Sequence, residues 1–134
     1  FRSAGNKIGF SRSKLHLGQI YIDQDRLLDA RQSLDSAETS GEYPETLWQV
    51  WFHRGRMHEK LGRLEEARKA YMESIDIIEN IRGNLTIDEF KSSYLENKRE
   101  VYEKLINLLQ EMGDPVEAFR YSERAKARAI CSRA

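Results

Sequence analysis

Apolar residues recur every three or four positions along most of the chain, with charged and polar residues between them. This spacing follows the turn of an α-helix and gives each helix one apolar face. No segment alternates apolar and polar residues as a half-buried strand would. The pattern is clearest in one stripe near the C-terminal end, which consists of Val101, Leu105, Leu108, Leu109 and Met112. We therefore predict an all-α fold.

Turn-forming residues interrupt this pattern and mark the ends of the predicted helices. The interruptions lie at 23–25, 40–44, 61–62, 82–84 and 113–115. They divide the chain into about six helices, over 6–23, 26–39, 45–61, 63–82, 87–112 and 115–131.

One stretch, LWQVWFHRGRMHEKLGRLEEARKAYMESIDIIE, has aromatic and small residues at the spacing of a helical repeat. The residues are Trp51, Gly55, His58, Gly62, Ala67, Tyr71 and Ser74. In this order the stretch closely resembles a tetratricopeptide repeat. The resemblance implies a right-handed superhelical solenoid of antiparallel helix pairs, which binds a peptide or a partner domain on its inner face.

The residue types within this stretch have physical reasons. Gly55 and Ala67 are small where two helices are expected to cross, so their backbones can approach closely. We expect Tyr71 to fill the gap between this repeat and its neighbour. Gly62 is expected to end the first helix, with Leu61 as its last buried residue.

Two further repeats align on the small residues. The first places Gly18, Tyr21, Ala30, Leu34 and Ala37 at the positions of Gly55, His58, Ala67, Tyr71 and Ser74, an offset of 37 residues. A third, extended repeat aligns Tyr102, Gly113, Ala118 and Ala125 with Trp51, Gly62, Ala67 and Ser74 at an offset of 51 residues. We predict a single domain with repeats at about 11–44, 48–82 and 87–132, cut from a longer chain.

The segment from Phe90 to Ala129 carries a second resemblance. Together with the stretch from Ile77 to Arg82, it is similar to the last helices of the tetratricopeptide regions that precede a CHAT domain, a caspase-like cysteine protease. This resemblance implies an alternative function, a regulatory or substrate-recruiting arm of such a protease. The catalytic residues would then lie beyond Ala134.

Register with the repeat places a set of side chains on the inner face. They are Arg12, Leu15, Gln19 and Ile22 from the first repeat, Gln49, Phe52, Arg56, Glu59 and Lys60 from the second, and Glu103, Asn107 and Gln110 from the third. Phe52 and Arg56 stand four residues apart, so we expect them to present an apolar ring beside a guanidinium. A ligand segment with an apolar side chain and a carboxylate would suit them. The alternative is a solvated face, or one occupied by the rest of the parent chain.

Composition narrows the possible partners. The 134 residues include 22 Lys+Arg and 22 Asp+Glu, a net charge of zero, which disfavours general nucleic-acid binding. Apolar runs are too short to span a membrane. The single cysteine, Cys131, fits a reducing compartment, so we predict a cytoplasmic protein.

No arrangement of residues predicts catalysis, a metal site or a cofactor. His53 and His58 are five residues apart and project in different directions on a helix. Cys131 has no histidine within 70 residues, and the carboxylates are explained by solvated helix faces. The glycines stand singly, so no phosphate-binding loop exists. We expect this chain itself to be no enzyme.

The last predicted helix has two features of its own. Its basic residues are Arg120, Arg124, Lys126, Arg128 and Arg133. They either contact RNA or an acidic partner, or complement the dipole of the helix, and the second is the default interpretation. Phe119, Tyr121 and Ile130 are expected to form an exposed patch through which the protein associates with itself.

Overall fold

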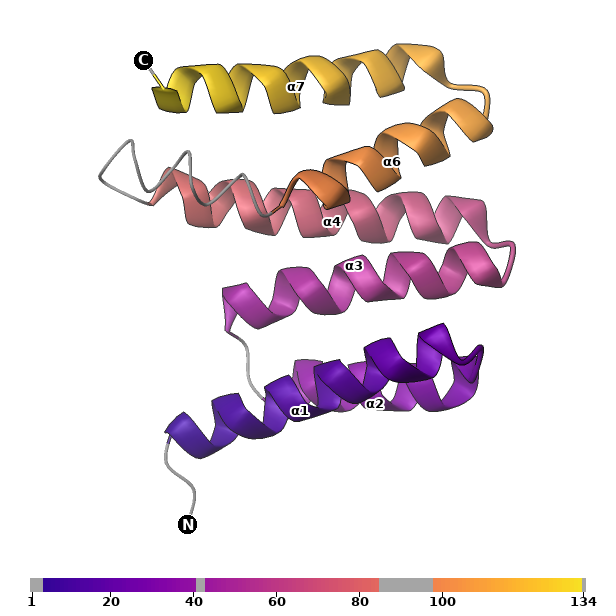
Figure 1. The fold of residues 1–134 in the computed structure, drawn as a ribbon, viewed down its shortest axis with the longest axis vertical. Coiled ribbons are helices and arrows are strands. Elements are labelled where there is room, and N and C mark those ends of the chain that lie inside the picture. The colour runs from indigo at the N-terminus through magenta and orange to yellow at the C-terminus, as the bar shows by residue number, and fades with distance from the viewer. Residues whose placement is uncertain (1–3, 41–42, 85–97, 134) are drawn as a thin grey trace. The chain divides into compact units, whose positions relative to one another are not determined.

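The computed structural model describes residues 4–40, 43–84 and 98–133, and the side chains within 9–39, 43–84 and 98–126. The helices are α1 (Ala4–Asp23), α2 (Leu27–Ser40), α3 (Pro44–Lys60), α4 (Leu64–Gly83), α6 (Arg99–Glu111) and α7 (Pro115–Arg133) (Figure 1). No strand occurs among the described residues, which confirms the prediction of an all-α fold. None of the described helices combines the length and the apolarity that crossing a bilayer requires.

One predicted helix, 87–112, differs from the structure. Lys98 lies in a turn with φ −107° and ψ 4°, and α6 begins only at Arg99. The prediction of an unbroken helix through Lys98 is therefore wrong. Residues 85–97 of the predicted helix lie outside the described residues.

The chain forms two compact units, Phe1–Ser74 and Ile75–Ala134, with the boundary inside α4. In the first unit, α1 packs on α2, and α3 packs on both. Its core contains small and aliphatic side chains, namely Leu15, Ile22, Ala30, Leu34, Ala37, Val50 and Met57. In the second unit, α6 packs on α7.

The helix pairs of the first unit meet at a glycine. A Cβ on Gly18 would lie 2.8 Å from Cδ2 of Leu34, and a Cβ on Gly55 would lie 2.8 Å from Cζ of Tyr71 and closer to other ring atoms. These two glycines are 37 residues apart, and so are Leu34 and Tyr71. The contact of Tyr71 with Gly55 places its ring within its own helix pair, not in a gap between repeats as predicted.

A buried hydrogen bond also recurs at this offset. The Ser11 hydroxyl donates to the Ala37 carbonyl at 2.6 Å, and the Ser74 hydroxyl donates to the Trp48 carbonyl at 2.7 Å. Trp48 follows Ser11 by 37 residues and Ser74 follows Ala37 by the same number, so the donor has moved from the first helix to the second. Both serines are fully buried.

The helix-to-helix turns of the three pairs share one geometry. The residue at the left-handed position is Asp25 (φ 61°), Gly62 (φ 75°) or Gly113 (φ 81°). In each turn the next N–H donates to the carbonyl five residues back, which closes the helix as a Schellman motif does. Leu61 does not end α3 as a buried residue, because it is 45% exposed; Met57 is the last buried residue.

In the second unit, an ion pair bridges α4 and α7. Arg124 donates to Glu79 through Nε at 2.8 Å and through Nη2 at 2.6 Å, and the Tyr102 hydroxyl donates to Glu79 at 2.7 Å. Tyr121 is buried, so the prediction that it lies in an exposed patch is wrong. Phe119 is 65% exposed, and the side chain of Ile130 lies outside the described side chains.

Candidate functional site

The predicted inner face, as far as the first unit forms it, consists of residues of α1 and α3. Its apolar members are not on the surface, because Leu15 and Phe52 are both only 6% exposed and Ile22 is fully buried. The Phe52 ring packs 5.8 Å from the Tyr71 ring and 5.2 Å from His53. The prediction of Phe52 as an exposed apolar anchor is therefore wrong: its ring completes the packing around Tyr71.

The cations of the inner face are engaged in ion pairs. Arg56 donates to Asp23 at 2.7 Å and also contacts Nδ1 of His53 at 3.1 Å. The hydrogen bond from Arg56 lowers the pKa of Asp23 below its usual value. Lys60 donates to Asp25 at 2.7 Å. The two pairs link α3 to the last residue of α1 and to the turn that follows it, and Arg56 does not stand beside an accessible ring.

The other predicted inner-face residues are polar. Arg12 and Gln19 are exposed on α1, and Gln49 donates its side-chain amide to the Glu45 carbonyl at 2.7 Å. Asn107 is exposed on α6 in the second unit. The inner face of the first unit is therefore a polar strip crossed by ion pairs.

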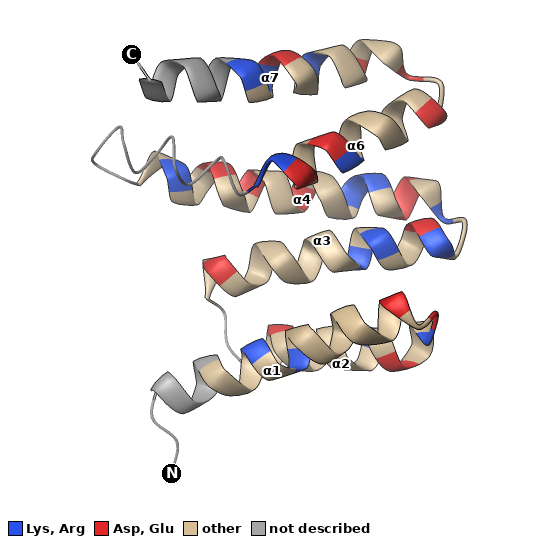
Figure 2. Cartoon of the chain, in the orientation of Figure 1, with Lys and Arg blue, Asp and Glu red and all other residues tan. Residues whose placement is uncertain are grey.

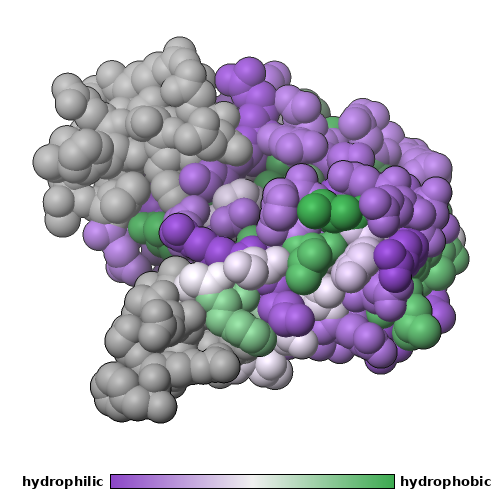
Figure 3. Space-filling view, turned by 60° about the horizontal axis from the view of Figure 1, so that its bottom comes forward, coloured by the Kyte–Doolittle hydropathy of each residue, from purple (hydrophilic) through white to green (hydrophobic). Residues whose placement is uncertain are grey.

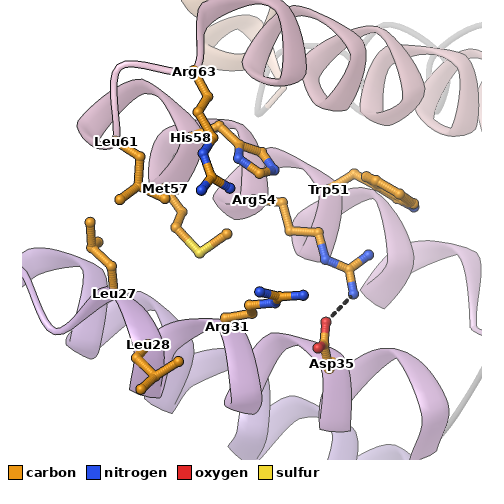
Figure 4. Close-up of a pocket in the computed structure, with 10 residues that line it drawn as sticks. All are labelled: Leu27, Leu28, Arg31, Asp35, Trp51, Arg54, Met57, His58, Leu61 and Arg63. Carbon is orange, nitrogen blue, oxygen red and sulfur yellow. Dashed lines mark hydrogen bonds and ion pairs between the residues drawn. The ribbon is translucent and has the colours of Figure 1, made fainter.

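A groove between α2 and α3, with a volume of about 450 Å³, was not predicted from the sequence. Its lining comes from both helices and from the turn after α3 (Figure 4), and consists of Leu27, Leu28, Arg31, Asp35, Trp51, Arg54, Met57, His58, Leu61 and Arg63. We call it the α2–α3 groove. The available signal was the pair Leu28 and Leu61, two leucines at helix ends that lie off the core stripe.

The apolar part of the α2–α3 groove is open to solvent. Met57 is buried, whereas Leu28 is 70% exposed and Leu61 is 45% exposed. On the face that Figure 3 displays, hydrophobic residues occur as small groups among hydrophilic residues. The two exposed leucines give the groove an apolar edge.

The cations of the groove differ in how they are held. Arg54 donates to Asp35 at 2.8 Å and to Glu38 at 2.6 Å, and its guanidinium stacks 4.7 Å from the Trp51 ring. Within the described part of the chain, Arg31 and Arg63 make no ion pair. Figure 4 shows their guanidinium groups entering the space from opposite sides. Figure 2 shows that the basic residues of α3 gather in its C-terminal half.

His58 adds a polar atom to the same groove. Its Nδ1 is buried and has no hydrogen-bond partner among the described residues. Burial lowers the pKa of His58 from its usual value of 6.5, and Glu66 opposes this shift. The imidazole is therefore neutral at pH 7, and its Nδ1 can accept or donate one hydrogen bond depending on the tautomer.

The metal and cysteine predictions concern side chains that the structure describes only in part. Among them, no three His, Cys, Asp or Glu side chains stand close enough together to hold a metal ion. The side chain of Cys131 lies outside the described side chains.

The basic residues of the last helix are largely paired. Besides the pair of Arg124 with Glu79, Arg120 pairs with Glu117 at 2.8 Å and Lys126 lies 3.6 Å from Glu123. Arg128 and Arg133 lie outside the described side chains. The described part of this helix is thus not a free cationic surface.

Comparison with known proteins identifies one element of this architecture. Neither a curated protein nor a solved structure matches the chain. Residues 48–81, which comprise most of α3 and most of α4, match the model of the tetratricopeptide repeat family. The helix pair that carries Trp51, Gly55 and Tyr71 is therefore a tetratricopeptide repeat.

Proposed function

We propose that this protein is an interaction scaffold that binds a peptide or a partner domain through its inner face. The observation that carries the proposal is the tetratricopeptide repeat at 48–81, because helix pairs of this kind serve mainly as protein-binding surfaces. The glycine contact and the buried hydroxyl bond that recur at the 37-residue offset support a second, similar pair in α1 and α2.

The polar strip determines what kind of segment the inner face would bind. Its carboxylates remain accessible, since the side chains of Asp23 and Asp25 are 57% and 76% exposed. Exposed ion pairs contribute only about 0–1 kcal/mol, so a partner can exchange them at little cost. A segment that carries both acidic and basic residues therefore suits this face better than a purely apolar one.

The test is binding to an array of short peptides of mixed charge. We expect the variant Arg12→Glu/Lys60→Glu to lose most of the peptides that the wild type binds. Arg120→Glu is the control for a single charge reversal away from the inner face, because Arg120 is an exposed arginine of the second unit. If the double variant binds the same peptides with the same strength, the inner face is not the binding surface.

A second candidate is a regulatory or substrate-recruiting arm of a CHAT protease, and the parent protein would then be cytoplasmic and proteolytic. It is favoured only by the resemblance of Phe90–Ala129 to the helices that precede such domains. The gene sequence beyond the codon for Ala134 tests it. A reading frame that encodes a caspase-like domain with its His and Cys is expected, and any other continuation contradicts this candidate.

Self-association through α7 is a further part of the proposal. Val116 and Phe119 are 67% and 65% exposed on this helix, an apolar surface that a second copy can cover. Sedimentation at increasing protein concentration should show dimers for the wild type and none for Phe119→Ser. A wild type that stays monomeric contradicts this part alone.

A further inference from the structure

We propose that the α2–α3 groove is a second binding site, which takes a short acidic peptide segment with leucine-like side chains next to its carboxylates. The site goes beyond the inner face, because it uses a different set of α3 residues. On α3 the groove is lined by Trp51, Arg54, Met57 and His58, none of which belongs to the inner face.

Size and polarity indicate a peptide segment. A volume of about 450 Å³ accommodates a few side chains and lies within the range of ligand sites in proteins. Leu28 and Leu61 rim this space with exposed apolar surface, and the buried Met57 lies between them in Figure 4. An apolar side chain placed there would remove both leucines from water, and this burial favours binding.

Charge indicates an acidic occupant. The groove is lined by three arginines and one aspartate. Asp35 and the neighbouring Glu38 both form ion pairs with Arg54. Glu66 is a further carboxylate, whose charge raises the pKa of His58. Arg31 and Arg63 are left without an ion pair in the described part of the chain. Each can hold a carboxylate with two parallel hydrogen bonds, so a segment with two carboxylates complements them.

The imidazole of His58 indicates that the ligand contributes a backbone amide group. His58 Nδ1 is buried, neutral at pH 7 and unbonded among the described residues. A buried nitrogen without a partner is costly, and one N–H or C=O of an incoming peptide would satisfy it. A ligand with apolar, acidic and amide groups meets all the demands of the groove.

The probe is the unlabelled peptide Gly-Leu-Leu-Glu-Glu-Leu-Gly, which is titrated into the ¹⁵N-labelled protein while the amide resonances of the protein are recorded. We expect saturable shifts at the Trp51 indole N–H and at the amides of Leu28 and Leu61. Arg31→Glu/Arg63→Glu should weaken binding about tenfold or more, because two charge-assisted contacts are lost and reversed. A peptide with lysine in place of both glutamates should bind the wild type poorly and this variant better.

The control variant is Arg12→Glu, which reverses the charge of one arginine on the inner face and should leave the groove shifts unchanged. No saturable binding of the acidic peptide, or equal affinity for the wild type and the double variant, overturns the site. Shifts confined to Gln19 and Lys60 also overturn it but leave the proposed function of the inner face intact. If Arg12→Glu loses peptide binding and Arg31→Glu/Arg63→Glu keeps it, the groove site is likewise overturned and the inner face remains the binding surface.

Discussion

The ring of Tyr71 occupies the place where a Cβ on Gly55 would lie, so Gly55 has no room for a side chain. Tyr71 is fully buried, and its hydroxyl donates a hydrogen bond to Glu59, so the ring is held at both ends. Gly18 meets Leu34 in the same way, but the atoms in the way belong to the flexible end of a leucine. The corresponding crossing in the first pair can therefore take an added methyl group at a lower cost.

We predict that Gly55→Ala destabilises the protein by about 1–3 kcal/mol, the usual range for overpacking. Gly18→Ala should cost less, because the end of Leu34 can move aside. Gly9→Ala is the control: it lies inside α1, no atom of the described residues lies within 4 Å of its added Cβ, and alanine favours a helix over glycine by about 0.5–1 kcal/mol. Thermal unfolding should therefore give Gly55→Ala the lowest melting temperature, Gly18→Ala an intermediate one and Gly9→Ala the highest. A melting temperature of Gly55→Ala equal to that of the wild type would contradict the crossing.

Asp25 holds a left-handed backbone where the other turns have glycine. We predict that Asp25→Gly raises the stability by up to about 1 kcal/mol, because a left-handed backbone costs other residues about 1–2 kcal/mol. The lost bond to Lys60 subtracts little, since the Asp25 side chain is 76% exposed. Asp25→Asn removes the charge and keeps the tolerance for this backbone, so it should stay close to the wild type. Urea unfolding checks this, and an Asp25→Gly variant less stable than Asp25→Asn would refute it.

Gly62 occupies the same left-handed position in the turn between α3 and α4, so replacing it should lower the stability. Its φ of 75° is unfavourable for any side chain, although no atom among the described residues lies within 4 Å of an added Cβ. We expect Gly62→Ala to cost about 1–2 kcal/mol through backbone conformation alone. Urea unfolding of Gly62→Ala beside Gly62→Asn should show the smaller loss for asparagine, and equal losses would argue for a steric cause.

The fold was largely predictable because its signals are local. Helix periodicity and turn residues depend on near neighbours in the chain, and they located the helices. The small residues Gly18 and Gly55 recur at the same place in a repeated pattern, which gave the 37-residue offset. Which face of α3 is covered depends on distant residues. Phe52 is buried because the Tyr71 ring lies beside it, and Arg56 is occupied because Asp23 ends α1 nearby.

The α2–α3 groove was missed for the same reason. Leu28 and Leu61 stand at helix ends 33 residues apart, and only the packing of α3 on α2 makes them part of one groove. The sequence also does not distinguish Arg54 from the other basic residues of α3. Its role in the groove depends on its contacts with Asp35, Glu38 and Trp51.

Glu79 gives a test confined to the second unit. Its side chain is only 12% exposed and accepts hydrogen bonds from Arg124 and Tyr102. We predict that Glu79→Gln costs about 1.5–3 kcal/mol, the range for hydrogen bonds to charged groups, and that Tyr102→Phe costs about 1 kcal/mol. The control is Glu117→Gln, whose partner Arg120 is 74% exposed and whose loss should be small. Hydrogen exchange of the α6 and α7 amides reports on this unit, and equal protection in Glu79→Gln and Glu117→Gln would contradict the prediction.

His53 should make the stability depend on pH. Its burial, with a smaller contribution from Arg56, lowers the pKa from 6.5 to about 4, and Nδ1 serves as the acceptor for Arg56. Because protonation is harder in the folded state, the contribution of His53 is complete above pH 6.5. It is lost as the pH falls toward about 4. The full loss is on the order of 3 kcal/mol, by the conversion of pKa differences into free energy.

His53→Asn keeps an acceptor for Arg56 but does not titrate between these pH values. We expect urea unfolding at several pH values from 7 to 4 to show a steep loss of stability for the wild type and a shallower one for His53→Asn. Some slope should remain, because the pKa of His58 is lowered as well. His16→Asn is the control, since His16 is exposed on α1. If His53→Asn and His16→Asn lose stability in parallel as the pH falls, His53 is not the buried titrating group.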